Sequence, residues 1–163
     1  MASAATAYRR ADIRHSLAGF GFLVPKKESR RILGTLFSSS MFEGRAPQGI
    51  VLLTTFVGGM RNPDLPAQPD GALGALVHEE LGALVGATNP PVWIDITRWT
   101  HAIPQYNVGH LARVRPLDDA ERARPGLFFC GGYRGGLSVG DCIKSAHGTA
   151  DAVTRFLVGV RAS

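Results

Sequence analysis

The chain has 163 residues, of which 45% are hydrophobic and 19% are charged, with a net charge of +5 at pH 7. This length is that of one domain with a real core, and the composition excludes disordered and collagen-like chains. The only two cysteines, Cys130 and Cys142, match neither a zinc-binding spacing nor a C-x-x-C redox pair. A disulfide-stabilised fold is therefore excluded as well.

The positive charge would permit nucleic-acid binding, so its distribution along the chain matters. The 18 Lys and Arg residues are dispersed, and those between residues 113 and 124 alternate with Asp and Glu. No aromatic residues interleave with them to form a stacking surface. We expect a solvated basic surface and no nucleic-acid partner, while an anionic small-molecule ligand stays compatible.

The sequence also bears on location. It has no run of about 18 apolar residues that could span a membrane, and residues 1–14 lack the apolar core of a signal peptide. We expect a cytoplasmic protein with no more than peripheral association with a membrane.

The first half of the chain predicts an antiparallel sheet. Residues 5–13 and 19–24 are expected to form two paired strands, and residues 31–38 and 50–57 two more, joined by a Gly- and Pro-containing loop. Residues 50–56 are apolar or Thr at every position. This pattern favours a strand in the sheet interior with both faces covered.

The second half predicts mainly helices. After a stretch rich in Gly and Pro, apolar residues recur at helical spacing from Leu73 to Val85, with Asp70 as the cap. Residues 92–97 resemble a short strand, and an irregular aromatic and polar segment follows. We then expect a short exposed helix beginning near Pro116, a buried strand at 127–130, and a final helix from Ser138.

The last strand and helix are joined by a Gly-rich turn. Its glycines fit neither G-x-G-x-x-G nor a Walker loop, in which Lys and Ser or Thr would replace Asp141 and Cys142. The spacing leaves cofactor contact and close backbone packing equally open. The start of the final helix, residues 138–141, favours negative charge from a phosphate or an electron-rich ring. We interpret Asp141 as a first-turn acid that complements the helix dipole.

Side chains for other chemistry are poorly arranged. Ser38, Ser39 and Ser40 lie outside any G-x-S-x-G motif, and the five histidines are scattered along the chain. No Cys or Ser has an activating base nearby in sequence. Any catalysis is therefore expected to belong to a cofactor, with no metal site.

Five motifs occur in a distinctive order. They are GFGFLVP at 19–25, LGTLFSSSMFEGRAP at 33–47, LTTFVGGMRNP at 53–63, RWTHAIPQYNVGH at 98–110, and PGLFFCGGYRGGLSVGDCIKS at 125–145. With these motifs the chain resembles the C-terminal part of the FAD-dependent protoporphyrinogen oxidases, which are similar in fold to the flavin amine oxidases. The resemblance covers nearly the whole chain.

This resemblance implies an α+β fold with two parts. Residues 1–97 would belong to a substrate-binding domain with an antiparallel sheet and a flanking helix. Residues 98–163 would form the C-terminal strand-turn-helix of an incomplete FAD-binding α/β domain. The implied activity is oxidation of protoporphyrinogen IX to protoporphyrin IX by FAD and oxygen, in heme or chlorophyll synthesis.

The resemblance also implies site residues. Phe20 would lie in the substrate pocket, with Phe22 as a companion that could instead be strand core. The helix start would lie by the pyrimidine edge of the flavin and stabilise the negative charge gained on reduction. The residues implied at the flavin are Trp99, Gly136, Leu137, Ser138 and Val139.

One departure from the family pattern concerns the rest of the cofactor site. The N-terminal strand and G-x-G-x-x-G turn that bind the ADP half of FAD are absent from these residues. We therefore expect a fragment, inactive unless an N-terminal partner segment or self-association completes it. The alternatives are a flavoenzyme acting on an amine or polyene, and a non-catalytic interaction module.

Overall fold

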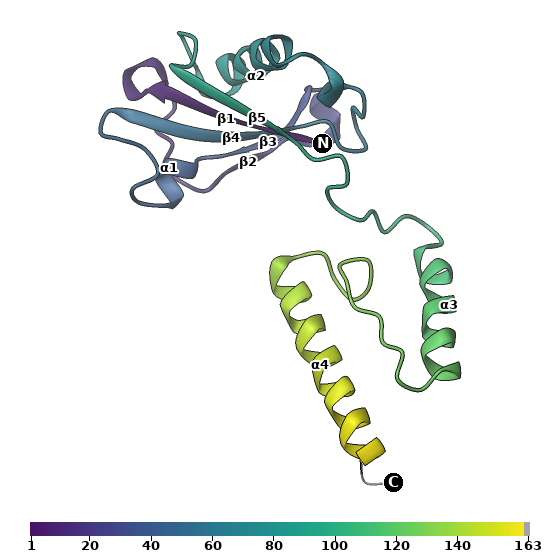
Figure 1. Ribbon diagram of the computed structural model, residues 1–163. Coiled ribbons are helices and arrows are strands. Elements are labelled where there is room, and N and C mark those ends of the chain that lie inside the picture. Colours follow the sequence, from purple (N-terminus) through teal and green to yellow (C-terminus); the bar gives the residue numbers. More distant parts are fainter. Residues whose placement is uncertain (162–163) are drawn as a thin grey trace. The chain divides into compact units, whose positions relative to one another are not determined.

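The chain divides into two compact units, Met1–Thr100 and His101–Ser163, called here the N-terminal and C-terminal units (Figure 1). The computed structural model describes residues 1–161. The division lies three residues beyond the boundary expected after Thr97. The assignment of the two parts to a substrate-binding and an FAD-binding domain stays a prediction.

The N-terminal unit is built on an antiparallel five-stranded sheet, which confirms the expected fold class. Its strand order is β2-β3-β4-β1-β5. The long strands β4 and β1 therefore lie inside the sheet, and β2 and β5 form its edges. The elements are β1 (Ala2–Arg9), β2 (Gly21–Leu23), β3 (Ile32–Leu36), α1 (Ser38–Met41), β4 (Ile50–Val57), α2 (Asp70–Val85) and β5 (Trp93–Arg98).

The position and pairing of the first strand differ from the prediction. β1 ends at Arg9, and Arg10–Asp12 form a short 3-10 turn. The expected pairing of the first two strands is wrong, because β1 pairs with β4 and β5, whereas β2 pairs with β3. β4 matches β1 over its full eight residues, whereas β2 has only three. The longer partner satisfies far more of the backbone groups of β1.

Strand β4 lies inside the sheet, as predicted, but only one of its faces is fully covered. Val51, Leu53, Thr55 and Val57 are buried, and the residues between them are half-buried. The expectation that both faces are covered is therefore wrong. Helix α2 covers one face of the sheet, and the short α1 lies on the opposite side (Figure 1).

Helix α2 spans the predicted residues and supplies much of the core. The expectation that Asp70 caps it is wrong, because Asp70 is its first residue, Pro69 occupies the cap position, and no side chain caps this end. Its buried side chains include Leu73, Val77 and Leu81, and Gly86 ends the helix in a left-handed conformation. The hydroxyl of buried Tyr8 lies 3.1 Å from Nδ1 of His78 on this helix. These contacts attach α2 to the side of β1 that Tyr8 occupies.

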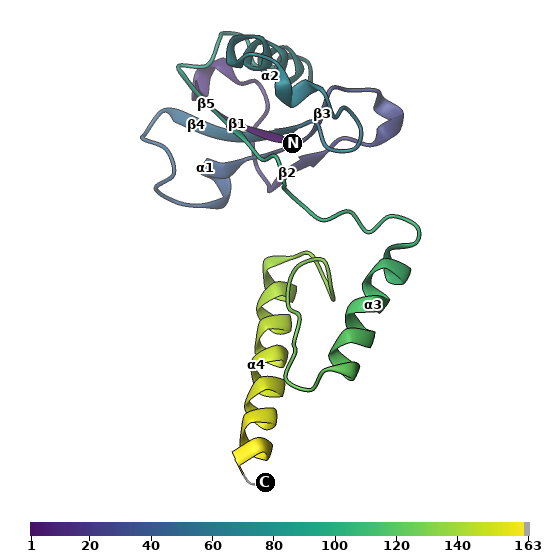
Figure 2. The same cartoon turned by 45° about the vertical axis from the view of Figure 1, so that its right-hand side comes forward.

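In the C-terminal unit, helices α3 (His110–Ala123) and α4 (Val139–Arg161) flank an irregular connection, as Figure 2 shows. α3 begins at His110 and contains Pro116, so the expected start near Pro116 is wrong. Proline there costs one backbone hydrogen bond, which the charged, helix-forming residues around it offset.

The predicted buried strand at residues 127–130 is also wrong. These residues have no strand pairing in the described chain; 127–129 are half-buried and Cys130 is exposed. A strand requires a neighbouring strand to satisfy its backbone, and the C-terminal unit contains none within residues 101–161.

Candidate functional site

The side of the sheet opposite α2 is the first candidate surface, called here the open face. On β1 it carries the small residues Ser3 and Ala5, which lie opposite Phe56 and Thr54 of β4 in the register. These four residues are half-buried, whereas their neighbours along both strands are buried against the core. Small side chains on a half-covered sheet leave room for a flat ligand to approach the backbone.

Phe20 is held outward beside a surface hollow. Gly19 and Gly21 on either side have φ values of 132° and 142°, which side chains other than glycine rarely adopt. A Cβ atom on Gly21 would lie 2.1 Å from the carbonyl oxygen of Thr35. Phe20 is 67% exposed. The hollow, of about 530 Å³, is lined by Gly19, Phe20, Ser40, Met41 and Phe42.

Phe22 has different surroundings. It lies in β2 opposite Thr35 and packs edge-to-face with buried Phe37, their ring centroids 6.1 Å apart. This position agrees with the interpretation of Phe22 as strand core. Its contact with a substrate stays a prediction.

Trp99 directly follows β5 and is bonded to the start of β1. Its backbone N–H donates to the carbonyl of Met1 at 2.8 Å, and its Nε1 donates to Oγ of Ser3 at 3.2 Å. Because Ser3 belongs to the open face, the indole lies at one end of that face. Half of the side chain is exposed and could contact a ligand.

In the C-terminal unit, Tyr106 connects the irregular segment before α3 with the Gly-rich turn. Its hydroxyl donates to the carbonyl of Gly132 at 2.8 Å and accepts from the N–H of Gly136 at 3.3 Å. The Tyr106 ring stacks on His110, whose Nε2 lies 2.8 Å from the carbonyl of Tyr133. Two aromatic side chains thus hold the turn in place.

The start of α4 contains a capping box. The N–H of Asp141 donates to Oγ of Ser138 at 3.0 Å, and the Ser138 hydroxyl donates back to Oδ2 of Asp141 at 2.7 Å. The hydrogen bonds from Ser138 lower the pKa of Asp141. Leu137 and Val139 are exposed beside this cap. The local role expected for Asp141, as a first-turn acid, is confirmed.

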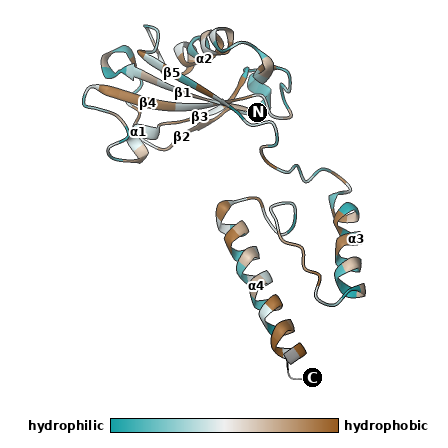
Figure 3. Cartoon of the chain, viewed as in Figure 1, coloured by the Kyte–Doolittle hydropathy of each residue, from teal (hydrophilic) through white to brown (hydrophobic). Residues whose placement is uncertain are grey.

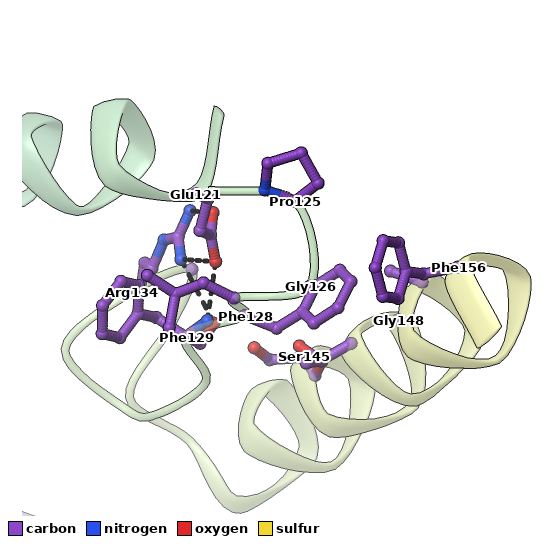
Figure 4. Close-up of a pocket in the computed structure, with 13 residues that line it drawn as sticks. Glu121, Pro125, Gly126, Phe128, Phe129, Arg134, Ser145, Gly148 and Phe156 are labelled. Atoms are coloured by element: carbon purple, nitrogen blue, oxygen red, sulfur yellow. Dashed lines mark hydrogen bonds and ion pairs between the residues drawn. The ribbon is translucent and has the colours of Figure 1, made fainter. Parts of the chain in front are cut away.

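A cluster of charged side chains joins the Gly-rich turn to helix α3 (Figure 4). Arg134 contacts both carboxylate oxygens of Glu121 at 2.7 and 2.6 Å, and it also pairs with Asp118. Glu121 accepts the N–H of Phe129 at 2.6 Å. The bonds from Arg134 and Phe129 lower the pKa of Glu121 to about 2. Asp118 and Glu121, whose charges alternate with basic residues in the sequence, are therefore ion-pair partners of Arg134.

The residues predicted at the site divide between the two units. Phe20, Phe22 and Trp99 belong to the N-terminal unit, and Gly136–Val139 to the C-terminal unit. Sequence reasoning did not single out Tyr106, His110, Glu121 or Arg134. The aromatic and polar composition of residues 98–110 was a signal for Tyr106 and His110. No sequence feature near Arg134 indicated its acidic partners.

Within residues 1–161, no group of three or more His, Cys, Asp or Glu side chains could hold a metal ion. No helix in that part of the chain is long and apolar enough to cross a membrane.

The fold and these motifs identify the class of protein. The family model described as flavin containing amine oxidoreductase matches residues 2–154. The chain belongs to this family, which confirms the resemblance found in the sequence.

Several relatives are named for porphyrinogen oxidation. The chain is 40% identical to the mitochondrial protoporphyrinogen oxidase of Nicotiana tabacum, over 95% of this chain and 31% of that protein. It is 37% identical to a coproporphyrinogen III oxidase of Propionibacterium freudenreichii, over 75% of this chain and 23% of that protein. A solved structure from Exiguobacterium sp. 255-15, provisionally described as a protoporphyrinogen oxidase, superposes with a TM-score of 0.72 at 26% identity, covering 96% of this chain and 33% of that one. The chain thus spans between about a quarter and a third of the length of these relatives, from 23% to 33%.

Proposed function

We propose that this chain is part of an FAD-dependent oxidoreductase that converts protoporphyrinogen IX to protoporphyrin IX with oxygen as electron acceptor. The observation that carries this proposal is the 40% identity over 95% of the chain to a protein named for that reaction. The structure adds a half-covered sheet face and an exposed Phe20, which suit a flat apolar substrate.

The start of α4 fits one edge of a flavin ring. Leu137 and Val139 offer exposed apolar surface, and the N–H groups of Val139 and Gly140 have no hydrogen-bond partner among residues 1–161. Such N–H groups at a helix start favour an acceptor that gains negative charge. Bound FAD would supply two-electron oxidation, of which three rounds are needed to convert a porphyrinogen to a porphyrin, while Phe20 and Trp99 would hold the substrate and the ring in position.

The proposal includes a requirement for further polypeptide. The described residues contain no phosphate-binding glycine motif, and more than two thirds of the length of these relatives lies outside the match, which covers 31% and 30% of them. We propose that a segment corresponding to that unmatched part, or self-association, completes the FAD site.

Coproporphyrinogen III is a second candidate substrate, because two relatives are named for its oxidation. It is a macrocycle of the same class with more carboxylates at its edge. Both porphyrinogens would suit an apolar face, so the substrate assay must include both.

The test is co-production of this chain with the part of the Nicotiana tabacum relative that it does not match. We expect flavin absorption bands and porphyrin fluorescence from a porphyrinogen in the complex, and neither from this chain alone. If the complex oxidised an amine or a polyene and no porphyrinogen, the proposed substrate would be wrong. Stoichiometric FAD on the chain alone would contradict the requirement for a partner, and a complex without flavin would favour a non-catalytic module.

A further inference from the structure

The position of the exposed Phe20 ring depends on the backbone that carries it. Its side chain is mostly exposed, so packing against the core does not fix the ring. The Phe20 carbonyl accepts the N–H of Phe37 at 3.0 Å. A binding side chain of this kind is held in place by the residues around it. Residues 10–20, called here the β1–β2 loop, therefore decide where Phe20 lies.

The β1–β2 loop has little apolar packing of its own. Figure 3 shows that most of this loop is hydrophilic, whereas strand β4 is mainly hydrophobic. Within the loop only Ile13 and Leu17 are buried. Leu17 has a φ of 58°, in the left-handed region that leucine rarely adopts. Such strain persists only where surrounding groups determine the conformation. Hydrogen bonds from side chains of the loop supply that constraint.

His15 is bonded through its N–H, its carbonyl and its ring. Its backbone N–H donates to the carbonyl of Val85, the last residue of α2, at 3.0 Å, and its Nδ1 accepts the N–H of Leu17 at 2.9 Å. Its carbonyl accepts from Nη2 of Arg10 at 2.8 Å. The Nη1 atom of Arg10 donates to the carbonyl of Ile13 at 2.9 Å. His15 thus ties the amide of the strained Leu17 to the end of α2, and Arg10 holds His15 in place.

The His15 ring also contacts the residue that binds the Phe20 carbonyl. The ring centroids of His15 and Phe37 are 5.4 Å apart, and Phe37 is buried. Phe37 directly precedes α1, whose Ser40 and Met41 line the hollow beside Phe20. Phe37 therefore fixes both Phe20 and the start of α1. His15 contacts this residue on one side and binds the Leu17 amide on the other.

We propose that His15 is a positioning residue that holds Phe20 at the edge of the hollow by accepting the N–H of Leu17. This proposal rests on the proposed function, in which Phe20 contacts the porphyrinogen. Because the loop is ordered in advance, substrate binding does not have to order it. Loss of this order should weaken binding of the substrate and of its transition state equally, which raises KM and leaves kcat unchanged.

Two substitutions of His15 separate its hydrogen bond from its ring. His15→Phe removes the acceptor but keeps a ring against Phe37. His15→Asn supplies an amide oxygen, which accepts the N–H two residues further on in an Asx turn. In the full chain, we expect amide exchange at Leu17 to be about fivefold faster in His15→Phe, and close to that of the unmodified chain in His15→Asn. His147→Phe, exposed on α4, is the control. Equal exchange at Leu17 in the two His15 variants would overturn the proposal.

The second measurement uses the full chain assembled with the unmatched part of the Nicotiana tabacum relative. The probe is protoporphyrin IX, whose binding is followed by quenching of its fluorescence. We expect His15→Phe to raise the dissociation constant for this probe and the KM for porphyrinogen about fivefold with kcat unchanged, and His15→Asn to restore both. If the loop only joined β1 to β2, His15→Phe would lower the amount of folded protein, and therefore kcat, with KM unchanged. That result would contradict the proposal.

A double variant tests whether His15 acts through Phe20. In the Phe20→Ala background, His15→Phe should weaken porphyrin binding no further, whereas additive losses would show that His15 acts elsewhere. Arg10→Lys, which cannot bond both carbonyls at once, should give the same pattern and replaces His15→Phe if that variant does not fold. Porphyrin binding that follows this pattern without porphyrinogen oxidation would count against the proposed function alone. An assembled protein that did not bind protoporphyrin IX would overturn both proposals.

Discussion

The hydroxyl of Tyr106 bonds to the carbonyl of Gly132 at 2.8 Å, and the same oxygen accepts the N–H of Gly136. Tyr106 thus joins the two ends of the Gly-rich turn that precedes α4. The predicted flavin contacts at residues 136–139 begin at the end of this turn.

Replacing Tyr106 by Phe removes both hydrogen bonds but keeps the stacking on His110. A lost bond of about 1 kcal/mol corresponds to roughly fivefold faster opening. We expect amide exchange at Gly136 to accelerate by about that factor. Tyr133→Phe is the control, because its hydroxyl has no partner among residues 1–161. Equal exchange rates at Gly136 in the two variants would show that Tyr106 does not hold the turn.

The carboxyl group of Glu121 should titrate far below the ordinary range. Hydrogen bonds from Arg134 and from the N–H of Phe129 lower its pKa from 4.5 to about 2. Because the pKa is lowered in the folded chain, the stabilisation is complete above about pH 4.5 and is lost as the pH falls through about 2. Carbon-detected NMR of the side chain measures this directly.

Arg134→Met removes the largest cause of this shift. The pKa of Glu121 should then rise toward its ordinary value of 4.5. Arg122→Met is the matched control, since Arg122 pairs with Asp119 rather than Glu121. A midpoint near 4 in the unmodified chain would contradict the ion pair.

Two buried threonines form a hydrogen bond that tests the core of the sheet. Oγ1 of Thr35 lies 3.0 Å from Oγ1 of Thr55, and both residues are buried. Thr55→Val leaves the Thr35 hydroxyl unpaired and should cost about 1–3 kcal/mol of unfolding free energy. The double variant Thr35→Val/Thr55→Val should cost less than the sum of the single variants, as measured by urea unfolding. Strictly additive losses would argue against the bond.

Replacing Phe20 should affect turnover, whereas replacing Phe22 should affect the free energy of unfolding. Phe20 is 67% exposed, so Phe20→Ala should change the unfolding free energy by no more than about 0.5 kcal/mol. Phe22 packs against the core, and Phe22→Ala should cost about 1–3 kcal/mol. In the assembled protein, Phe20→Ala should lower kcat/KM for the porphyrinogen at least tenfold. Unchanged kcat/KM would remove Phe20 from the substrate pocket.

Local sequence determined the elements whose signal lies within their own residues. The continuous apolar run of β4 and the helical spacing of α2 predicted both spans correctly, because side-chain periodicity reflects the backbone period. The ordered motifs determined the family, since they combine glycines and aromatic residues at fixed positions along the whole chain.

Tertiary structure alone decided what depends on distant partners. The pairing of β1 with β4 and β5 could not be derived from either strand, because every strand offers the same backbone groups and the length of the available partner determines the match. The same holds for Glu121 and Arg134. Their charges are typical of a surface in the sequence, and only folding brings them within 2.7 Å of each other and brings the Glu121 carboxylate within 2.6 Å of the Phe129 backbone nitrogen. Residues 127–130 show the converse, because an apolar run becomes a strand only where another strand satisfies its edge.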